Sequence, residues 1–143
     1  MIAEPKQKKT LKIIFDSNVF FVSLKFKIDI FEELKSLLGM NFEPILLSPI
    51  HRELEGLTEK GSLKDRKNAR HALQLAEKCK LVEVEEHLDS PDDLIMKVAE
   101  EWNAPVFTND KQLREKLRNI NVPVIYVRQK ARLEMDGRIQ SLV

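Results

Sequence analysis

Residues 11–18 form the stretch Leu-Lys-Ile-Ile-Phe-Asp-Ser-Asn, in which a short apolar run ends abruptly at three polar residues. Asp, Ser and Asn favour turns and helix caps, so this pattern predicts a buried strand over 11–15 with Asp16 directly after it. A second stretch, Ala-Pro-Val-Phe-Thr-Asn-Asp at 104–110, has the same form and predicts a strand over 104–107 that leads to Asp110. Two strands that each lead to a carboxylate are therefore the starting point for both fold and function.

The rest of the chain continues this alternation of short apolar runs and helical periodicity. Further strands are predicted over 44–47, 81–85 and 122–127, and helices over 29–38, 49–58, 63–79, 91–102 and 111–118. Ser48 is expected to cap the 49–58 helix, because Pro49 follows it at the first helical position. About five strands that alternate with helices are typical of an α/β domain, in which helices cover both faces of a mainly parallel sheet. In such sheets ligands bind at the carboxyl ends of the strands.

The composition indicates a single folded domain. The chain has 143 residues, of which 43% are hydrophobic and 33% charged, and its formal net charge is +1. This length suits one domain, and the balance excludes a wholly disordered chain. A single cysteine excludes a disulfide framework, and no apolar run approaches the roughly 18 residues of a membrane helix. We expect a cytoplasmic protein with a flexible basic tail over 1–10, the main domain over 11–128 and a C-terminal extension over 129–143.

Three carboxylates follow predicted strands, and each has a structural alternative. Asp16 and Asp110 lie at the carboxyl edge of the predicted sheet, but Asp is also a favoured N-cap residue. Glu53 falls in the second turn of the 49–58 helix, about 60° from Ile50 on its apolar face. Its side chain either points into the crevice, where a buried charge needs a partner, or reaches water from the edge of the helix.

The 91–102 helix begins with two acids that its periodicity separates. Ser90 and Pro91 mark the helix start, and Asp93 falls at the third helical position, where it suits a capping box. Asp92 lies about 60° from the centre of the buried face, and Asp93 about 160° away. Asp92 is thus the carboxylate without a local structural task, and we favour it over Asp93 for function.

Four acids at one edge of a sheet imply a cation. Carboxylates that share a site raise one another's pKa unless a positive charge neutralises them. A carboxylate cluster without His or Cys selects a hard ion, Mg²⁺ or Mn²⁺, with further ligands from water and substrate phosphate. The chemistry that this arrangement implies is metal-assisted hydrolysis of a phosphodiester bond.

Taken in order, these residues resemble the PIN-domain ribonucleases. The resemblance covers about residues 11–128 and rests on four motifs at strand and helix ends: Asp16-Ser17-Asn18, Glu53, Asp92 and Thr108-Asn109-Asp110. It implies a three-layer, Rossmann-like fold and endonucleolytic cleavage of single-stranded RNA with Mg²⁺ or Mn²⁺. It also implies that Asp16, Glu53, Asp92 and Asp110 are the catalytic, metal-binding acids, and that Asn18 and Thr108 are supporting polar groups.

The resemblance leaves three features open. Asp93 stands beside Asp92 where many family members have one acid, so either one is a candidate metal ligand. Val122–Lys130 resembles archaeal PIN proteins similar to the ribosome-biogenesis nucleases more than it resembles VapC-type toxins. Many family members pair as dimers, so a homodimer is an additional expectation.

Two basic groups are candidates for RNA binding. A stripe opposite the apolar face of the 63–79 helix and a cluster after the last strand together contain Lys60, Lys64, Lys67, Arg70, Arg128 and Lys130. Basic stripes bind phosphates without reading sequence. The alternative for the stripe is an ordinary solvated helix face.

The functional hypothesis is therefore a Mg²⁺- or Mn²⁺-dependent endoribonuclease, with ribosomal RNA maturation or a toxin role as competing biological settings. A non-catalytic RNA-binding or ribosome-assembly module is the alternative from another class, and the four clustered acids argue against it. A receiver-type α/β domain also gathers acids at strand ends, but the strand at Val124–Val127 offers no Lys beside a phosphorylatable Asp.

Overall fold

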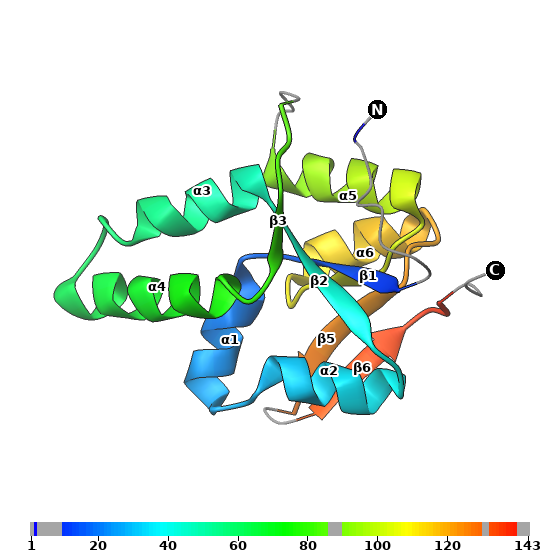
Figure 1. Ribbon diagram of the computed structural model, residues 1–143, viewed down its shortest axis with the longest axis horizontal. Coiled ribbons are helices and arrows are strands. Elements are labelled where there is room, and N and C mark those ends of the chain that lie inside the picture. Colours follow the sequence, from blue (N-terminus) through cyan, green and yellow to red (C-terminus); the bar gives the residue numbers. More distant parts are fainter. Residues whose placement is uncertain (1, 3–9, 86–89, 130–131, 140–143) are drawn as a thin grey trace.

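The computed structural model of the chain describes residues 2, 10–85, 90–129 and 132–139 (Figure 1). Within these ranges the strands are β1 Leu11–Phe15, β2 Phe42–Leu47, β3 Lys80–Val82, β4 Val106–Phe107, β5 Val124–Arg128 and β6 Arg132–Asp136. The helices are α1 Asn18–Phe26, α2 Ile30–Leu38, α3 Ser48–Leu57, α4 Leu63–Ala76, α5 Pro91–Trp102 and α6 Lys111–Asn119. No helix in these parts of the chain is both long and apolar enough to span a membrane.

The strands form one sheet in the order β3-β2-β1-β4-β5-β6. All neighbouring strands pair in parallel except β5 and β6, which are antiparallel. The chain builds outward from β1 to β2 and β3, then returns across the sheet and adds β4 and β5 on the other side of β1. Because parallel crossovers are right-handed, this reversal places α1, α2 and α4 on one face of the sheet and α5 and α6 on the other (Figure 1). The three-layer α/β/α fold with a mainly parallel sheet is thus confirmed.

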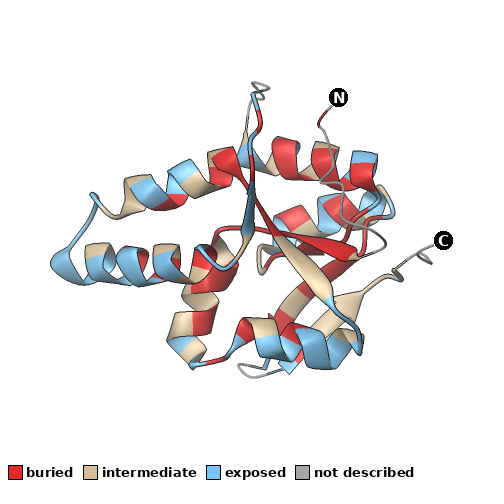
Figure 2. Ribbon diagram, in the orientation of Figure 1, coloured by how far each residue is buried: buried red, intermediate tan, exposed pale blue. Residues whose placement is uncertain are grey.

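The aromatic core lies directly beneath the ends of β1 and β4. Phe15, the last residue of β1, packs edge to face against Phe107 at the end of β4, with ring centroids 5.2 Å apart. The rings of Phe20 and Phe31 also pack against the Phe15 ring, with centroid distances of 5.8 and 5.6 Å. Burial of one such side chain contributes about 1.5–3 kcal/mol. Figure 2 shows the buried positions concentrated in the central strands and on the inner sides of the helices. This packing fixes the two strand ends from which the predicted acids extend.

Two elements of the structure are missing from the sequence prediction. Helix α1 was not predicted, because Asn18–Phe26 is crowded with aromatic and β-branched residues that have no clear helical spacing. Strand β6 was not predicted either, so the sheet has six strands in the described residues and not about five. Only Leu133 of β6 is buried, and pairing with β5 rather than hydrophobicity makes this segment a strand.

The segments outside 11–128 also take part in the fold. Strand β6 extends the sheet to Asp136, within the range that the sequence leaves as an extension. Ile2 is buried, and its carbonyl accepts a hydrogen bond from Nε1 of Trp102 on α5 at 3.2 Å. This residue is therefore packed, whereas the other tail residues up to Lys9 lie outside the described part of the chain.

Two helix boundaries need correction. The N-cap of α3 is Leu47, and Ser48 is already helical; its hydroxyl accepts a 2.8 Å hydrogen bond from the Val84 backbone N–H instead of capping the helix. This bond connects the start of α3 to the chain that follows β3. Helix α4 ends at Ala76, which leaves Cys79 beyond it, where burial raises the pKa of the thiol to about 12.

Candidate functional site

Strands β1 and β4 bring Asp16 and Thr108 together. The strands pair in parallel with Phe15 opposite Phe107, so the next residue of each strand emerges at the same edge of the sheet. The Asp16 backbone N–H donates to the Phe107 carbonyl at 3.0 Å. Asp16 is only 7% exposed and Thr108 is fully buried. The predicted placement of Asp16 at the carboxyl edge of the sheet is confirmed.

Three donors hold the carboxylate of Asp16 in place. Its Oδ1 accepts the Ser17 backbone N–H at 2.8 Å. Its Oδ2 accepts the Thr108 hydroxyl at 2.7 Å and the Asn18 side-chain amide at 3.0 Å. A carboxylate fixed on both oxygens presents its remaining lone pairs in a constant direction, which suits a ligand more than a mobile surface charge.

The surroundings of Asp16 oppose its ionisation. Burial is the main cause that raises its pKa from 3.8 to about 6, and the negative charges of Asp92 and Glu53 raise it further. The hydrogen bonds from Thr108 and Ser17 act in the opposite direction. Asp92 and Glu53 thus lie close enough to Asp16 for their charges to affect it, although all three come from different elements.

Glu53 is linked to Asp16 through Ser17. The Ser17 hydroxyl donates to Oε1 of Glu53 at 3.1 Å, while the Ser17 backbone binds Asp16. Glu53 stands in the second turn of α3, which begins directly after β2, and it is exposed to solvent. Of the two alternatives for Glu53, the structure therefore shows a side chain directed to the strand ends yet accessible to water.

The two acids at the start of α5 differ in their surroundings. Asp92 is half-buried and Asp93 is exposed, as the helical periodicity predicts. The Asp93 backbone N–H donates to the Ser90 hydroxyl at 3.1 Å, which is the N-cap contact of α5. Burial raises the pKa of Asp92, as do the charges of Asp110 and Asp93, whereas the charge of Lys116 lowers it.

Asp110 has both of the roles that the sequence leaves open. It is the N-cap of α6, and its Oδ1 accepts the backbone N–H groups of Gln112 and Leu113 at 2.9 and 3.3 Å. Its charge also acts on Asp92. The cap bonds use one carboxylate oxygen, so a cap and a ligand are compatible at this position. Glu53, Asp16, Asp92 and Asp110 thus form a series, in that order, in which the charge of each acid acts on a neighbour in the series.

The two polar residues expected to support the acids do so. Besides binding Asp16, the Asn18 side chain accepts the Asn109 backbone N–H at 3.0 Å and donates to the Thr108 hydroxyl at 3.3 Å. The Thr108 hydroxyl also accepts the Asp110 backbone N–H at 3.1 Å. Asn18 and Thr108 therefore tie the end of β1 to the loop that carries Asp110.

Sequence reasoning did not assign Ser17, Asn109 or Lys116. Asn109 binds the backbone of β5, with its Oδ1 accepting the Val127 N–H at 2.8 Å and its Nδ2 donating to the Val127 carbonyl at 3.4 Å. These contacts join the residue that follows Thr108 to β5, 18 positions further along the chain. Apart from the positions of Ser17 and Asn109 within the polar runs that end β1 and β4, the sequence contains no signal for them.

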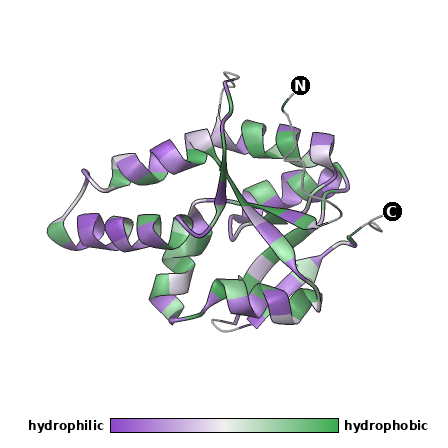
Figure 3. Cartoon of the chain, in the orientation of Figure 1, coloured by the Kyte–Doolittle hydropathy of each residue, from purple (hydrophilic) through white to green (hydrophobic). Residues whose placement is uncertain are grey.

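The basic residues expected to bind RNA fall into two separate places. Lys60, Lys64, Lys67 and Arg70 are exposed on and before α4, whose visible face is largely hydrophilic (Figure 3). Arg128 is exposed at the end of β5, on the other side of β1 in the sheet. Lys130 lies outside the described residues. The structure does not bring the two groups together.

The donors present fit a hard divalent cation. The acids offer only carboxylate oxygens. Burial first, and then mutual repulsion, raise the pKa of Asp16 and Asp92, and a cation would offset both. Within the described ranges, no three His, Cys, Asp or Glu side chains are grouped closely enough to hold a metal ion by themselves. Mg²⁺ commonly uses only one or two carboxylates and keeps several waters, so the fit does not require a closed cage.

Comparisons with known proteins identify the family of the chain. Residues 13–130 match the family model described as "PIN like domain". The chain is 37% identical over 129 residues to "Ribonuclease VapC4" of Methanocaldococcus jannaschii, covering 90% of this chain and 98% of the relative. It is 28% identical over 131 residues to "Ribonuclease VapC9" of Archaeoglobus fulgidus, covering 92% and 93%.

A solved structure shares the fold and part of the sequence. The PIN domain endonuclease Utp24 superposes with a TM-score of 0.77 at 26% identity, covering 92% of this chain and 95% of that one. A domain of a functionally unknown Methanocaldococcus jannaschii protein has a TM-score of 0.61 at 19% identity, covering 83% and 92%, and shows the fold alone. The family match extends from β1 to the end of β5 and so includes all the acids of the site. The chain therefore belongs to the PIN-domain ribonuclease family.

Proposed function

We propose that this protein is a metal-dependent endoribonuclease that hydrolyses phosphodiester bonds of single-stranded RNA. The observation that carries the proposal is that Asp16, at the end of β1, feels the charges of Glu53 on α3 and Asp92 on α5, and that Asp92 feels the charge of Asp110 at the start of α6. Burial and the charges of its neighbours raise the pKa of Asp16 to about 6. Keeping this carboxylate ionised therefore costs free energy, which a bound cation would offset. The ribonuclease and endonuclease names of the relatives support the same reaction.

The four acids share one part in this mechanism, and neighbouring polar residues support them. Asp16, Glu53, Asp92 and Asp110 would hold Mg²⁺ or Mn²⁺, with Asp92 preferred to Asp93 because Asp93 is exposed and adjoins the Ser90 cap contact. Held by these acids, such an ion would supply a water ligand of lowered pKa and a positive charge beside the phosphate. Thr108 and Asn18 keep the Asp16 carboxylate oriented, and Ser17 positions Glu53.

The direct test is cleavage of a 5′-labelled, unstructured RNA oligonucleotide. We expect products with Mg²⁺ or Mn²⁺, none with EDTA, and none from the Asp16→Asn or Glu53→Gln variants. Glu55→Gln is the matched control, because Glu55 is an exposed acid on the same helix that pairs with His51 at 3.2 Å. RNA binding without cleavage by the wild-type chain, with either ion, would support the non-catalytic binding module instead.

The biological setting has two candidates. Processing of ribosomal RNA is favoured by the resemblance of Val122–Lys130, and a toxin role by the VapC names of two sequence relatives. Induced expression separates them: a toxin arrests growth in a manner that requires Asp16, and a processing enzyme does not. The homodimer that the family resemblance implies stays a prediction, which sedimentation of the full chain tests.

A further inference from the structure

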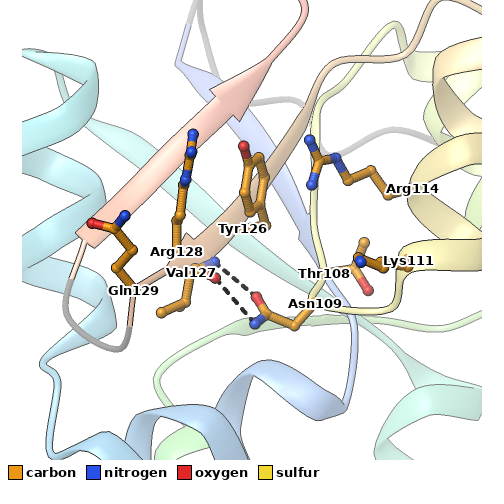
Figure 4. A pocket seen from close by; sticks show the side chains of 8 residues that line it. All are labelled: Thr108, Asn109, Lys111, Arg114, Tyr126, Val127, Arg128 and Gln129. Atoms are coloured by element: carbon orange, nitrogen blue, oxygen red, sulfur yellow. Dashed lines mark hydrogen bonds between the residues drawn. The ribbon is translucent and has the colours of Figure 1, made fainter.

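A cleft lies next to the acids, on the side of β5 and α6. Its volume is about 550 Å³, within the size range of pockets that hold one small ligand (Figure 4). At its base the Asn109 amide is bonded to the Val127 backbone. Thr108 and Asn109 line this cleft and also belong to the network around Asp16. The cleft and the acidic site therefore share the loop between β4 and α6.

The side chains around the cleft are mainly cationic. Figure 4 shows the Tyr126 ring standing between the guanidinium groups of Arg128 and Arg114. The Arg114 guanidinium carbon lies 3.7 Å from the centre of this ring, a close cation–π contact that orients the charge. Lys111 adds a third cation at the first position of α6. Three cations within one cleft favour a ligand with more than one negative charge.

Two acids of β6 face the same arginines. Glu134 accepts from Arg128 at 3.0 Å and from the Tyr126 hydroxyl at 3.2 Å. Asp136 pairs with Arg114 and with Arg118, each at 3.3 Å. The paired side chains are 29–56% exposed. Exposed pairs of this kind contribute only about 0–1 kcal/mol, so a phosphate can compete with these carboxylates for the guanidinium groups. Lys111 makes no ion pair with any described residue.

We infer that this cleft is a phosphate subsite, in which Lys111, Arg114 and Arg128 hold the RNA backbone beside the bond to be cleaved. The inference rests on the proposed function and adds to it the path of the strand. Lys111 directly follows Asp110, so a strand that crosses the acidic site meets the cleft immediately afterwards. The recognition is of backbone phosphate and not of base sequence, because guanidinium and ammonium groups form its contacts.

The test measures binding separately from cleavage. A fluorescein-labelled ten-nucleotide oligouridine is titrated with the full wild-type chain in EDTA, at several salt concentrations. The variants are Lys111→Gln, Arg128→Gln and their combination, with Lys35→Gln on the exposed side of α2 as the control. We expect the slope of log affinity against log salt to fall by about 0.7 for each cleft cation removed, and to be unchanged by the control. Melting curves check that each variant folds.

The possible outcomes separate the cleft from the nuclease activity. If the double variant has the same slope of log affinity against log salt as the wild type, the cleft is not a phosphate subsite. This holds even where the wild type cleaves RNA with Mg²⁺ or Mn²⁺. Lys64→Gln and Lys67→Gln on α4 are measured in the same way, and a loss confined to these two variants also overturns the inference and places the strand on α4. A reduced slope without cleavage by the wild type supports the cleft and overturns the proposed reaction. Uridine monophosphate is added as a competitor, to distinguish a site for a free nucleotide from a site for the RNA strand. If it displaces the labelled RNA at concentrations similar to those of unlabelled RNA, the cleft is a mononucleotide site and the inference is overturned.

Discussion

The Thr108 hydroxyl donates a 2.7 Å hydrogen bond to Oδ2 of Asp16, a residue 92 positions earlier in the chain. The same hydroxyl accepts the Asp110 backbone N–H at 3.1 Å. One buried side chain thus sets the position of one acid and the backbone of another. It achieves this because β1 and β4 are neighbours in the sheet, and a slip of one residue in their register would separate all three groups.

Replacement of Asp92 and of Asp93 by asparagine is expected to have unequal effects. Asp92→Asn removes a half-buried carboxylate that interacts with Asp110 and Asp16, and we expect kcat for RNA cleavage to fall by more than about 100-fold. Asp93→Asn changes an exposed acid and is expected to retain activity within a few-fold. Single-turnover cleavage at saturating Mn²⁺ measures both. A larger loss in Asp93→Asn would show that the second acid is the ligand.

Asp16→Asn is expected to stabilise the metal-free protein at pH 7. The pKa of Asp16 is raised in the folded state to about 6, so between about pH 4 and pH 6 the native state binds more protons than the unfolded state and stability falls as pH rises. A shift of this size corresponds to at most about 3 kcal/mol, and we expect a gain of about 1–2 kcal/mol for the neutral variant at pH 7.

Thermal melting in EDTA from pH 4 to pH 8 measures this difference. The stability gain of Asp16→Asn should shrink toward pH 4, where the wild-type carboxyl is protonated in the folded state and only about half ionised in the unfolded state. Glu115→Gln, which neutralises an exposed acid on α6, is the control. A wild-type protein that becomes more stable than Asp16→Asn as pH rises from 4 to 7 without metal would contradict the assignment of Asp16 as a destabilised acid.

Ser17→Ala is expected to lower activity without affecting the fold. The change removes the 3.1 Å hydrogen bond that positions Glu53, while the Ser17 backbone bond to Asp16 remains. Because Glu53 is exposed, the loss should be about 1 kcal/mol, or about fivefold in kcat. Ser36→Ala on α2 is the control, and melting curves should coincide for all three proteins. Equal kcat values for Ser17→Ala and the wild type would argue that Glu53 needs no positioning.

Asn109→Ala is expected to act through stability. Loss of the side-chain amide leaves the backbone of Val127 without its partners, which costs about 1–3 kcal/mol. For a chain of this size the melting temperature should fall by about 3–10 °C. Asn68→Ala on the exposed surface of α4 should shift it little. Comparable melting temperatures for both variants would show that the loop does not depend on its attachment to β5.

The parts of the site that the sequence predicts are those fixed by local patterns. Asp16 follows an apolar run, and simple helical geometry separates half-buried Asp92 from exposed Asp93. The contacts of Ser17 with Glu53 and of Asn109 with Val127 depend on which strands become neighbours, and no local pattern contains that information. Ser48 illustrates the same limit, since its hydroxyl binds Val84 instead of capping its own helix.

The missed elements have a similar explanation. Helix α1 has a composition typical of a strand. Its packing against α4, and the contact of Phe20 with Phe15 of β1, override that preference. Strand β6 has few apolar residues, so its sequence does not indicate a strand. Antiparallel pairing with β5 stabilises its extended conformation instead. In both cases the surrounding tertiary structure, and not intrinsic propensity, determines the element.

The reversal of strand order at β1 determines when, during synthesis of the chain, the acids of the proposed site can come together. The acids of the proposed site come from positions 16, 53, 92 and 110, and β4 inserts beside β1 only after the first three have been made. A nascent chain that ends before β4 contains three of the four acids but lacks the strand that aligns Asp16 with Thr108, and we expect it to be inactive. Late completion of the sheet would thus keep the proposed nuclease inactive until the ribosome has synthesised nearly the whole chain.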